Sequence, residues 1–260
     1  MRVDAANTQQ LAMMRLSSGQ RINSAADDAA GLAISELMRG QVRGEDVATR
    51  NMRDSQSMYA TAEGALNASH SVLQRMRGLS VQANNGMLTD SDRAMIQQEF
   101  SQLRDSLDSI GRYTQYNTKN LLDGSLQEAN TTVNANGESM QMSLSSALAA
   151  NLGDGESGMT LADVNLQSNP EDALKVIDGA IAQISDSRST IGAKNNRLDH
   201  AINVSTNKQV NMQAAESRIR DADIAQQVME MNRSDLLQQT YFATQKMQQN
   251  MAGQLFNALF

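Results

Sequence analysis

Few side chains in this chain of 260 residues have the types and spacing that catalysis needs. Histidine is the usual general acid or base near neutral pH, but His70 and His200 are isolated and no Ser-His-Asp arrangement is indicated. Two groups of carboxylates, Asp27-Asp28 and Asp221 with Asp223, fall where helices are expected to begin or end. Capping of those ends explains them more simply than catalysis does. We therefore expect no enzymatic activity.

Metal and cofactor sites are not indicated either. With no Cys and two His, the chain cannot form a thiolate site, and a multi-histidine site is close to excluded. The run 153–158 lacks the ligand spacing and the closing Glu of a calcium loop, and no phosphate-binding loop is present. We expect no cofactor. The seventeen Met residues could form an adaptable binding surface, but their heptad positions favour packing between helices.

The composition bounds the fold and the partners. Aromatic residues make up 3% of the chain and Trp is absent, which argues against a thick globular core, while a single Pro permits very long helices. The net charge of -7 argues against a nucleic-acid-binding protein. No apolar run reaches the roughly 18 residues that cross a membrane. The first residues lack the pattern of a cleaved signal peptide, so we expect a cytosolic protein or one exported by another route.

The last third of the chain has the clearest helical periodicity. Asn169 can cap a helix that begins at Pro170, and apolar residues then recur at heptad spacing to Ile219. The register slips within 217–221, which predicts a bend or a domain boundary there. A second apolar stripe follows and is expected to join copies of the chain. Its main members are Leu236, Met247, Met251, Leu255 and Leu259.

The first half of the chain is also helical in pattern. Two seven-residue lines, Met38 to Leu73 and Gln41 to Met76, predict one long helix that ends at Asn84-Asn85-Gly86. Thr89 or Asp90 then caps a shorter helix. In the middle of the chain, 131–134 and 140–144 alternate as strands do, and Asn136-Gly137 between them predicts a hairpin. The fold class is therefore mainly α, with long helices folded back into one antiparallel bundle.

One segment carries a resemblance to a known family. Residues 15–34, RLSSGQRINSAADDAAGLAI, resemble the N-terminal signature of bacterial flagellins, in which Gly19 allows a turn with positive φ and Ser24 can act as a cap. Three further segments agree in order: 74–83, 188–198 and 215–225 are similar to helices of the flagellin core and to the joint into its terminal helix. The resemblance covers roughly residues 15–125 and 170–260.

The resemblance implies the flagellin core fold, an elongated antiparallel helical bundle with a small β-hairpin and a terminal coiled coil. We expect five parts: an N-terminal segment and signature loop at 1–30, the two halves of the helical core at 31–125 and 170–220, a hairpin and loop region at 126–169, and a terminal coiled-coil helix at 221–260. Only fourteen residues precede Arg15, fewer than is usual in the family, so 236–260 is expected to lack a full-length partner helix in its own chain.

The resemblance also implies function and partners. The protein would polymerise into the extracellular flagellar filament for motility and leave the cell through the flagellar type III apparatus, without a cleaved signal peptide. Its partners would be other copies of itself, a cytosolic export chaperone, the flagellar cap and junction proteins, and Toll-like receptor 5 of a host. By motif position, receptor recognition and subunit contact would involve Arg75, Leu79 and Glu99.

Three alternatives remain open at the level of sequence. A hook–filament junction protein shares the same plan at both ends of the chain, although it usually matches these signatures less closely. A free coiled-coil binding module that does not polymerise would need no terminal helix that stays apolar through 255–260. A secreted bundle acting only as a toxin or ligand would not form fibres.

Overall fold

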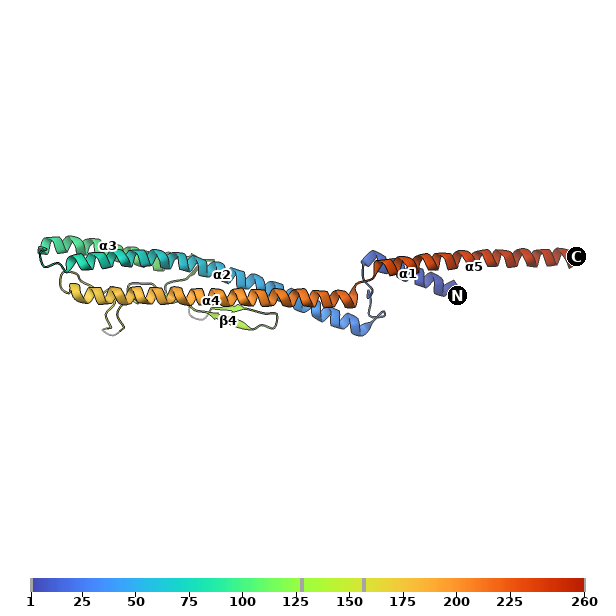
Figure 1. Ribbon diagram of the computed structural model, residues 1–260, viewed down its shortest axis with the longest axis horizontal. Coiled ribbons are helices and arrows are strands. Elements are labelled where there is room, and N and C mark those ends of the chain that lie inside the picture. Colours follow the sequence, from blue (N-terminus) through green and yellow to red (C-terminus); the bar gives the residue numbers. More distant parts are fainter. Residues whose placement is uncertain (1, 127–128, 156–157, 260) are drawn as a thin grey trace. The chain divides into compact units, whose positions relative to one another are not determined.

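The computed structural model describes residues 2–126, 129–155 and 158–259. In those residues, five helices carry most of the chain and two small antiparallel hairpins are inserted between them (Figure 1). The elements, in chain order, are α1 (Arg2–Ser18), α2 (Ala29–Ala83), α3 (Asp90–Tyr113), β1 (Gln115–Tyr116), β2 (Lys119–Asn120), β3 (Ala129–Thr132), β4 (Ser139–Met142), α4 (Pro170–Arg220) and α5 (Ile224–Leu259). The prediction of a mainly helical chain with a small β-hairpin is confirmed.

The chain divides into two compact units. Unit 1 consists of Met1–Arg43 together with Lys208–Phe260, and unit 2 consists of Gly44–Asn207. Both divisions fall inside continuous helices, α2 and α4, rather than in loops. The predicted break after 217–221 corresponds to the end of α4 at Arg220 and the start of α5 at Ile224.

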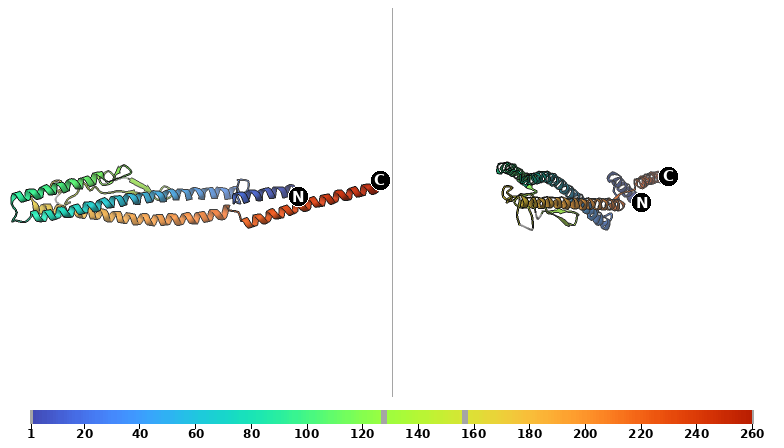
Figure 2. Two further views of the ribbon diagram at one scale, coloured as in Figure 1. Left: turned by 90° about the horizontal axis from the view of Figure 1, so that it is seen from above. Right: turned by 60° about the vertical axis from the view of Figure 1, so that its left-hand side comes forward.

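Unit 2 is built on the heptad lines of α2. From Glu45 to Met76, every member of the two predicted lines is buried. This stripe packs against α3 and α4, which lie beside α2 in both views (Figure 2). Two side-chain pairs set the antiparallel register: Gln56 donates to Asp199 over 2.6 Å, and Arg77 donates to Asp178 over 2.6 Å. The core therefore runs along the helices as a thin line rather than as a thick centre.

The start of α3 shows how local chemistry fixes a helix end. The Thr89 side chain accepts a hydrogen bond from the Asp92 backbone amide, and Asp92 accepts one in return from the Thr89 backbone amide. This capping box satisfies two amides that the helix itself leaves unpaired. Beyond it, Ile96, Phe100 and Leu107 are buried in the core of unit 2. The predicted helix is confirmed, and of the two predicted caps, Thr89 and Asp90, the structure has Thr89.

The predicted hairpin is present with different strand limits. The strands are Ala129–Thr132 and Ser139–Met142, so β3 ends two residues earlier than expected. The reason is the Asn134 side chain, whose Oδ1 accepts hydrogen bonds from the backbone amides of Asn136 and Glu138. Those amides are then satisfied by a turn instead of a strand ladder. Gly137 completes the turn with a φ of 85°.

A second hairpin, formed by β1 and β2, was not predicted. Its turn residues, Asn117 and Thr118, have φ values of 48° and 65°. Side chains other than glycine seldom adopt this conformation. The sequence has no glycine at this turn, so the usual signal of a positive φ is missing. Asn117 is a weaker signal, because Asn adopts a positive φ more often than most other side chains.

We predict that Tyr59 makes the unfolding of unit 2 sensitive to alkaline pH. Its side chain is fully buried, its hydroxyl has no hydrogen-bond partner among the described residues, and burial raises its pKa to about 12. The ordinary value is about 10, so the unfolded chain releases this proton first as the pH rises. The free energy of unfolding should therefore fall by up to about 2–3 kcal/mol between pH 10 and pH 12.

Chemical denaturation of Tyr59→Phe across this pH range tests the assignment. The variant should lack the alkaline loss and should be at least as stable as the parent at pH 7, because an unpaired buried hydroxyl is removed. Tyr113→Phe is the matched control, since the Tyr113 side chain is 77% exposed. A Tyr59→Phe protein that keeps the parental pH dependence would show that another group is responsible.

Candidate functional site

Within unit 1, a short backbone ladder joins the segment after α1 to the end of α4. The Arg21 amide donates to the Arg220 carbonyl over 2.6 Å, and the Ala222 amide donates to the Gly19 carbonyl over 2.9 Å. Gly19 has a φ of 69°, as the sequence predicted for the turn at this point. We call the residues 19–28 and 217–223 the joint. It connects two parts of the chain that are about two hundred positions apart in sequence.

Arg220 reinforces the joint through its side chain, which is only 11% exposed. Its Nε donates to Gln20 Oε1 over 3.0 Å and its Nη1 donates to Glu36 Oε1 over 2.8 Å. Arg39 donates to the same Glu36 oxygen over 2.8 Å. The hydrogen bond from Arg220 is the largest of the effects that lower the pKa of the Glu36 carboxyl. Two guanidinium groups thus hold one carboxylate, which ties α2 to the end of α4.

Asp27 organises the loop that leads into α2. Its Oδ2 accepts hydrogen bonds from the Asn23 amide at 3.1 Å, the Ser24 amide at 2.9 Å and the Ser24 hydroxyl at 3.0 Å. These bonds, chiefly the one from the Ser24 amide, lower the pKa of Asp27. Asp28 accepts from the Gly31 amide over 2.8 Å in the first turn of α2. The carboxylates of this loop therefore hold backbone amides.

The second carboxylate group has the same kind of role. Asp221 accepts a hydrogen bond from the Ser217 hydroxyl over 2.5 Å, and Asp223 accepts one from the Gln226 amide over 3.2 Å at the start of α5. Both contacts lie at helix ends, as the sequence predicted. These two hydrogen bonds stabilise the connection between α4 and α5.

The face of α5 that meets α1 is more polar than the sequence pattern suggested. Gln227 and Ser234 are 5% and 2% exposed on it. Gln9 of α1 bridges two residues of this face: its Nε2 donates to Asp235 Oδ1 over 2.5 Å, and its Oε1 accepts from Gln238 Nε2 over 2.8 Å. The register is antiparallel, because residues near 20 meet residues near 221 and Gln9 meets 235–238. Side-chain hydrogen bonds therefore align this helix pair.

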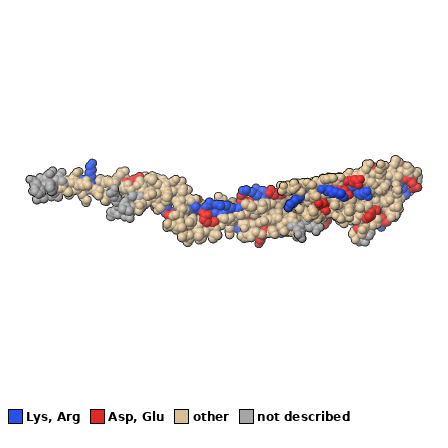
Figure 3. All heavy atoms as spheres, turned by 180° about the vertical axis from the view of Figure 1, so that it is seen from behind, with Lys and Arg blue, Asp and Glu red and all other residues tan. Residues whose placement is uncertain are grey.

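The opposite side of α5 carries large apolar side chains that are exposed. The predicted assembly residues Leu236, Met247 and Met251 are 62%, 64% and 60% exposed. Every side chain from 242 to 252 is exposed, and the face of α5 drawn in Figure 3 carries few charged residues. We call the apolar residues on this side, away from Gln227 and Ser234, the outer face of α5. The side chains of the predicted residues Leu255 and Leu259 lie outside the described residues.

The structure brings two of the three predicted recognition residues together. Arg75 on α2 donates from Nε and Nη2 to Glu99 Oε1 on α3, over 2.9 and 2.6 Å, and both side chains are exposed. Leu79 differs from the expected placement on the accessible face with Arg75, because it is 1% exposed in the core of unit 2. It lies three residues after Met76 and continues the buried stripe of α2, so a partner on this surface would meet Arg75 and Glu99.

Several methionines also differ from the expectation that they pack between helices. Met52, Met76, Met140 and Met142 are buried, but seven others in the described part of the chain are 50% to 90% exposed. The exposed ones are Met13, Met14, Met87, Met95, Met229, Met247 and Met251. The sequence spacing shows which residues share a helix face, but it does not show whether another element covers that face.

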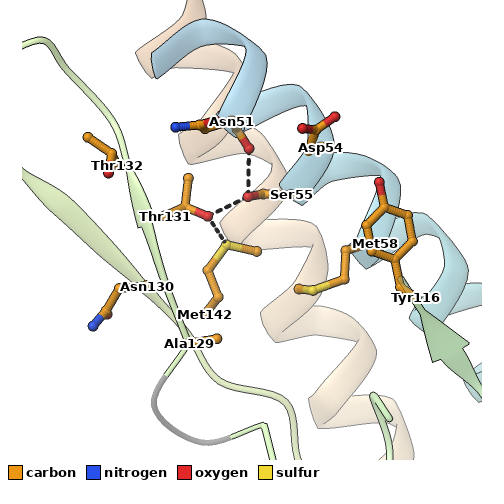
Figure 4. A pocket seen from close by; sticks show the side chains of 10 residues that line it. All are labelled: Asn51, Asp54, Ser55, Met58, Tyr116, Ala129, Asn130, Thr131, Thr132 and Met142. Carbon is orange, nitrogen blue, oxygen red and sulfur yellow. Dashed lines mark hydrogen bonds between the residues drawn. The ribbon is translucent and has the colours of Figure 1, made fainter. Parts of the chain in front are cut away.

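A cavity of about 280 Å³ lies between α2 and the β3–β4 hairpin (Figure 4). The Ser55 and Thr131 hydroxyls hydrogen-bond to each other at 2.5 Å on its wall, and Thr131 also donates to the sulfur of Met142 over 2.7 Å. The titratable groups of its lining are Asp54 and Tyr116. This set contains no paired acid and base or nucleophile with a base beside it.

Among the residues that the structure describes, no group of three or more His, Asp or Glu side chains is arranged to hold a metal ion. Within the same residues, no helix has the length and apolar character needed to cross a membrane.

Comparison with known proteins gives matches at both ends of the chain. Family models described as the bacterial flagellin N-terminal and C-terminal helical regions match residues 3–127 and 174–256. A flagellin of Halalkalibacterium halodurans is 44% identical over 234 residues, which cover 90% of this chain and 85% of that protein.

Solved structures agree with this match. Bacillus cereus flagellin has a TM-score of 0.50 and 31% identity, and the match covers 64% of this chain and 94% of that one. A structure described as a flagellar hook-associated protein from Vibrio parahaemolyticus has a TM-score of 0.62, covering 75% of this chain and all of that one. Its identity is 19%, so this likeness concerns the fold alone.

We predict that Gly19→Ala destabilises unit 1 by about 1–2 kcal/mol, because a Cβ disfavours the positive φ that the joint requires. Gly40→Ala is the matched control: a Cβ at either position meets no atom within 4 Å, but Gly40 lies in the regular helix α2. The control should gain up to about 1 kcal/mol. Urea unfolding followed by circular dichroism compares the two, and equal effects of the same sign would argue against strain at the joint.

Proposed function

The chain belongs to the bacterial flagellin family, and from that premise we propose that it polymerises into a flagellar filament through the outer face of α5. The family is one of structural proteins, and this chain matches its relative over most of both lengths. The filament lies outside the cell, so the working place of this subunit is extracellular and its role is structural, in motility.

The observation that carries the proposal is the exposure of large apolar side chains along α5. Monomeric proteins rarely expose a long apolar face without a partner. Burying Leu236, Met247 and Met251 against neighbours is worth roughly 1.5–3 kcal/mol for each side chain. The gain is repeated in every subunit of a polymer, whereas a monomer leaves these side chains in water.

The sequence comparisons favour a filament subunit over a hook–filament junction protein. The flagellin relative is 44% identical, whereas the hook-associated structure is 19% identical. The remaining alternatives are a coiled-coil module that stops at a dimer and a secreted bundle that acts only as a toxin or ligand. Light scattering at increasing protein concentration separates a filament subunit from both, because only a filament subunit keeps growing.

The proposal extends to the route by which the subunit reaches the filament. We propose export through the flagellar type III apparatus without a cleaved signal peptide, with a cytosolic chaperone covering the outer face of α5 until assembly. The cap and junction proteins of the flagellum would then contact the same subunit at the ends of the filament. The exposed apolar residues of α5 support this view, since they would associate prematurely if left uncovered.

We expect deletion of residues 240–260 to leave unit 2 folded and to abolish filament growth, because much of the outer face of α5 is removed. A finer variant, Leu236→Gln, should reduce growth while retaining the helix. Val204→Gln on α4 is the control, since Val204 is also exposed, at 66%. Sedimentation and electron microscopy measure growth, and fibres formed by the deletion variant at the parental protein concentration would refute the role of α5.

We further propose that the exposed pair Arg75–Glu99 is part of the surface that Toll-like receptor 5 recognises on the free subunit. The two side chains come from different helices and are 60% and 44% exposed, so a partner can reach both. The subunit-contact role proposed for the same surface would hide it in the polymer. Leu79 is not included, because its side chain is buried.

Arg75→Ala should weaken receptor binding by the monomer, since it removes a charged contact from this surface. Arg77→Ala is the matched control: Arg77 lies two residues away on α2, is 50% exposed and also forms an ion pair, with Asp178. Surface plasmon resonance with the receptor ectodomain measures both. Unchanged affinity for Arg75→Ala, or an equal loss for Arg77→Ala, would remove Arg75 from the site.

A further inference from the structure

Methionine is the most oxidisable residue type that this chain offers to peroxides. The chain has seventeen Met residues, no Cys and no Trp. The sulfur of Met accepts an oxygen atom in a two-electron oxidation, and accessibility decides which Met residues react first. Among the described residues, seven Met side chains are at least half exposed, whereas Met52 and Met76 are fully buried. The fold therefore divides the methionines into accessible and protected groups.

Three accessible methionines share the outer face of α5. Met229, Met247 and Met251 are 64%, 64% and 60% exposed. Eighteen residues separate the first two and four separate the last two. These intervals are close to whole numbers of helical turns at 3.6 residues per turn, so the three sulfurs project from one side. That side is roughly opposite Gln227 and Ser234, the buried residues that face α1.

We propose that Met229, Met247 and Met251 form an oxidation-sensitive modification site that controls whether a free subunit can polymerise. The modifying reagents are small two-electron oxidants of the peroxide class. This inference rests on the proposed function, because the proposed function assigns the outer face of α5 to contact between copies. The inference adds that the same face is a target of covalent modification before assembly.

The reaction is balanced with peroxide as the co-reactant. The thioether sulfur attacks one peroxide oxygen, a sulfur–oxygen bond forms and the oxygen–oxygen bond breaks. The sulfur loses two electrons and becomes a sulfoxide. The departing oxygen takes up the protons of the peroxide and leaves as water.

The product is unsuited to an apolar contact. A sulfoxide is polar, so a neighbouring subunit that buries it must also desolvate it. One poorly satisfied polar group at such a contact reduces affinity by about tenfold. Assembly in turn would protect the three sulfurs, because the neighbour covers them. Oxidation is therefore expected to act on free subunits and to spare assembled ones.

The test uses the full chain treated with enough hydrogen peroxide to oxidise each exposed Met partially. After growth and sedimentation, mass spectrometry compares the sulfoxide content at each position in the pellet and the supernatant. We expect sulfoxide at 229, 247 and 251 to be depleted in the pellet by about tenfold, and sulfoxide at Met87, which is 90% exposed on the loop after α2, to be equal in both. Equal sulfoxide at the three α5 positions in both fractions would overturn the proposal.

A variant separates the site from other methionines. The triple variant Met229→Leu, Met247→Leu, Met251→Leu keeps the apolar volume and should grow with or without peroxide. The control Met87→Leu, Met95→Leu should stay sensitive, and methionine sulfoxide reductase should restore its growth. Loss of growth on oxidation of the triple variant would contradict the assignment. Failure of the untreated parent chain to grow would instead contradict the proposed function, so the two failures are distinguishable.

Discussion

Burial of one continuous stripe on α2 is the interaction on which unit 2 depends. Large aromatic side chains are scarce, so the core cannot be a compact cluster of rings. Instead, Met52, Tyr59, Leu66 and Leu73 recur every seven residues and are covered by α3, α4 and the loop region that follows β4. Small residues between them, such as Ala62 and Ser69, allow the neighbouring helices to approach. A long thin core of this kind spreads its stabilisation evenly along the helices.

Unit 1 reverses this arrangement. Its helix pair, α1 and α5, buries Gln227, Ser234 and the apolar Ala12, is joined by the Gln9 hydrogen bonds, and leaves many of its large apolar residues exposed. Hydrogen bonds between side chains give orientation but little net free energy in water. The pair is therefore aligned by its polar contacts, and its exposed apolar side chains are free to take part in the contacts between copies proposed above. The proposed assembly surface and its proposed sensitivity to oxidation both rest on this arrangement.

Local and repeated signals were the part of the structure that sequence could predict. The seven-residue lines of α2, a cap at the start of α3 and the positive φ of Gly19 depend on neighbouring residues, so their patterns are visible in the sequence. The joint was predicted as a boundary because the register slips there. Its ladder between Arg21 and Arg220 joins distant positions and has no sequence signature.

The surfaces were harder to predict, for a physical reason. Spacing shows that Arg75 and Leu79 are near one another on α2, but the position of a covering element decides which of them is buried. Leu79 lies under the core and Arg75 does not. Met247 and Met76 both suit heptad packing, yet one is exposed and the other is buried. The turn at Asn117 and Thr118 was not predicted, because its backbone conformation is rare for these residue types.

The exposed stretch from 243 to 252 has a thermodynamic consequence for the free subunit. A helical segment of this length whose side chains are all exposed is only marginally stable in water, because its own backbone hydrogen bonds barely offset the loss of conformational entropy. Docking against a neighbour would supply the missing burial, so part of the folding reaction is completed during association. Calorimetry of growth would then show a larger negative heat-capacity change than the docking of two rigid surfaces.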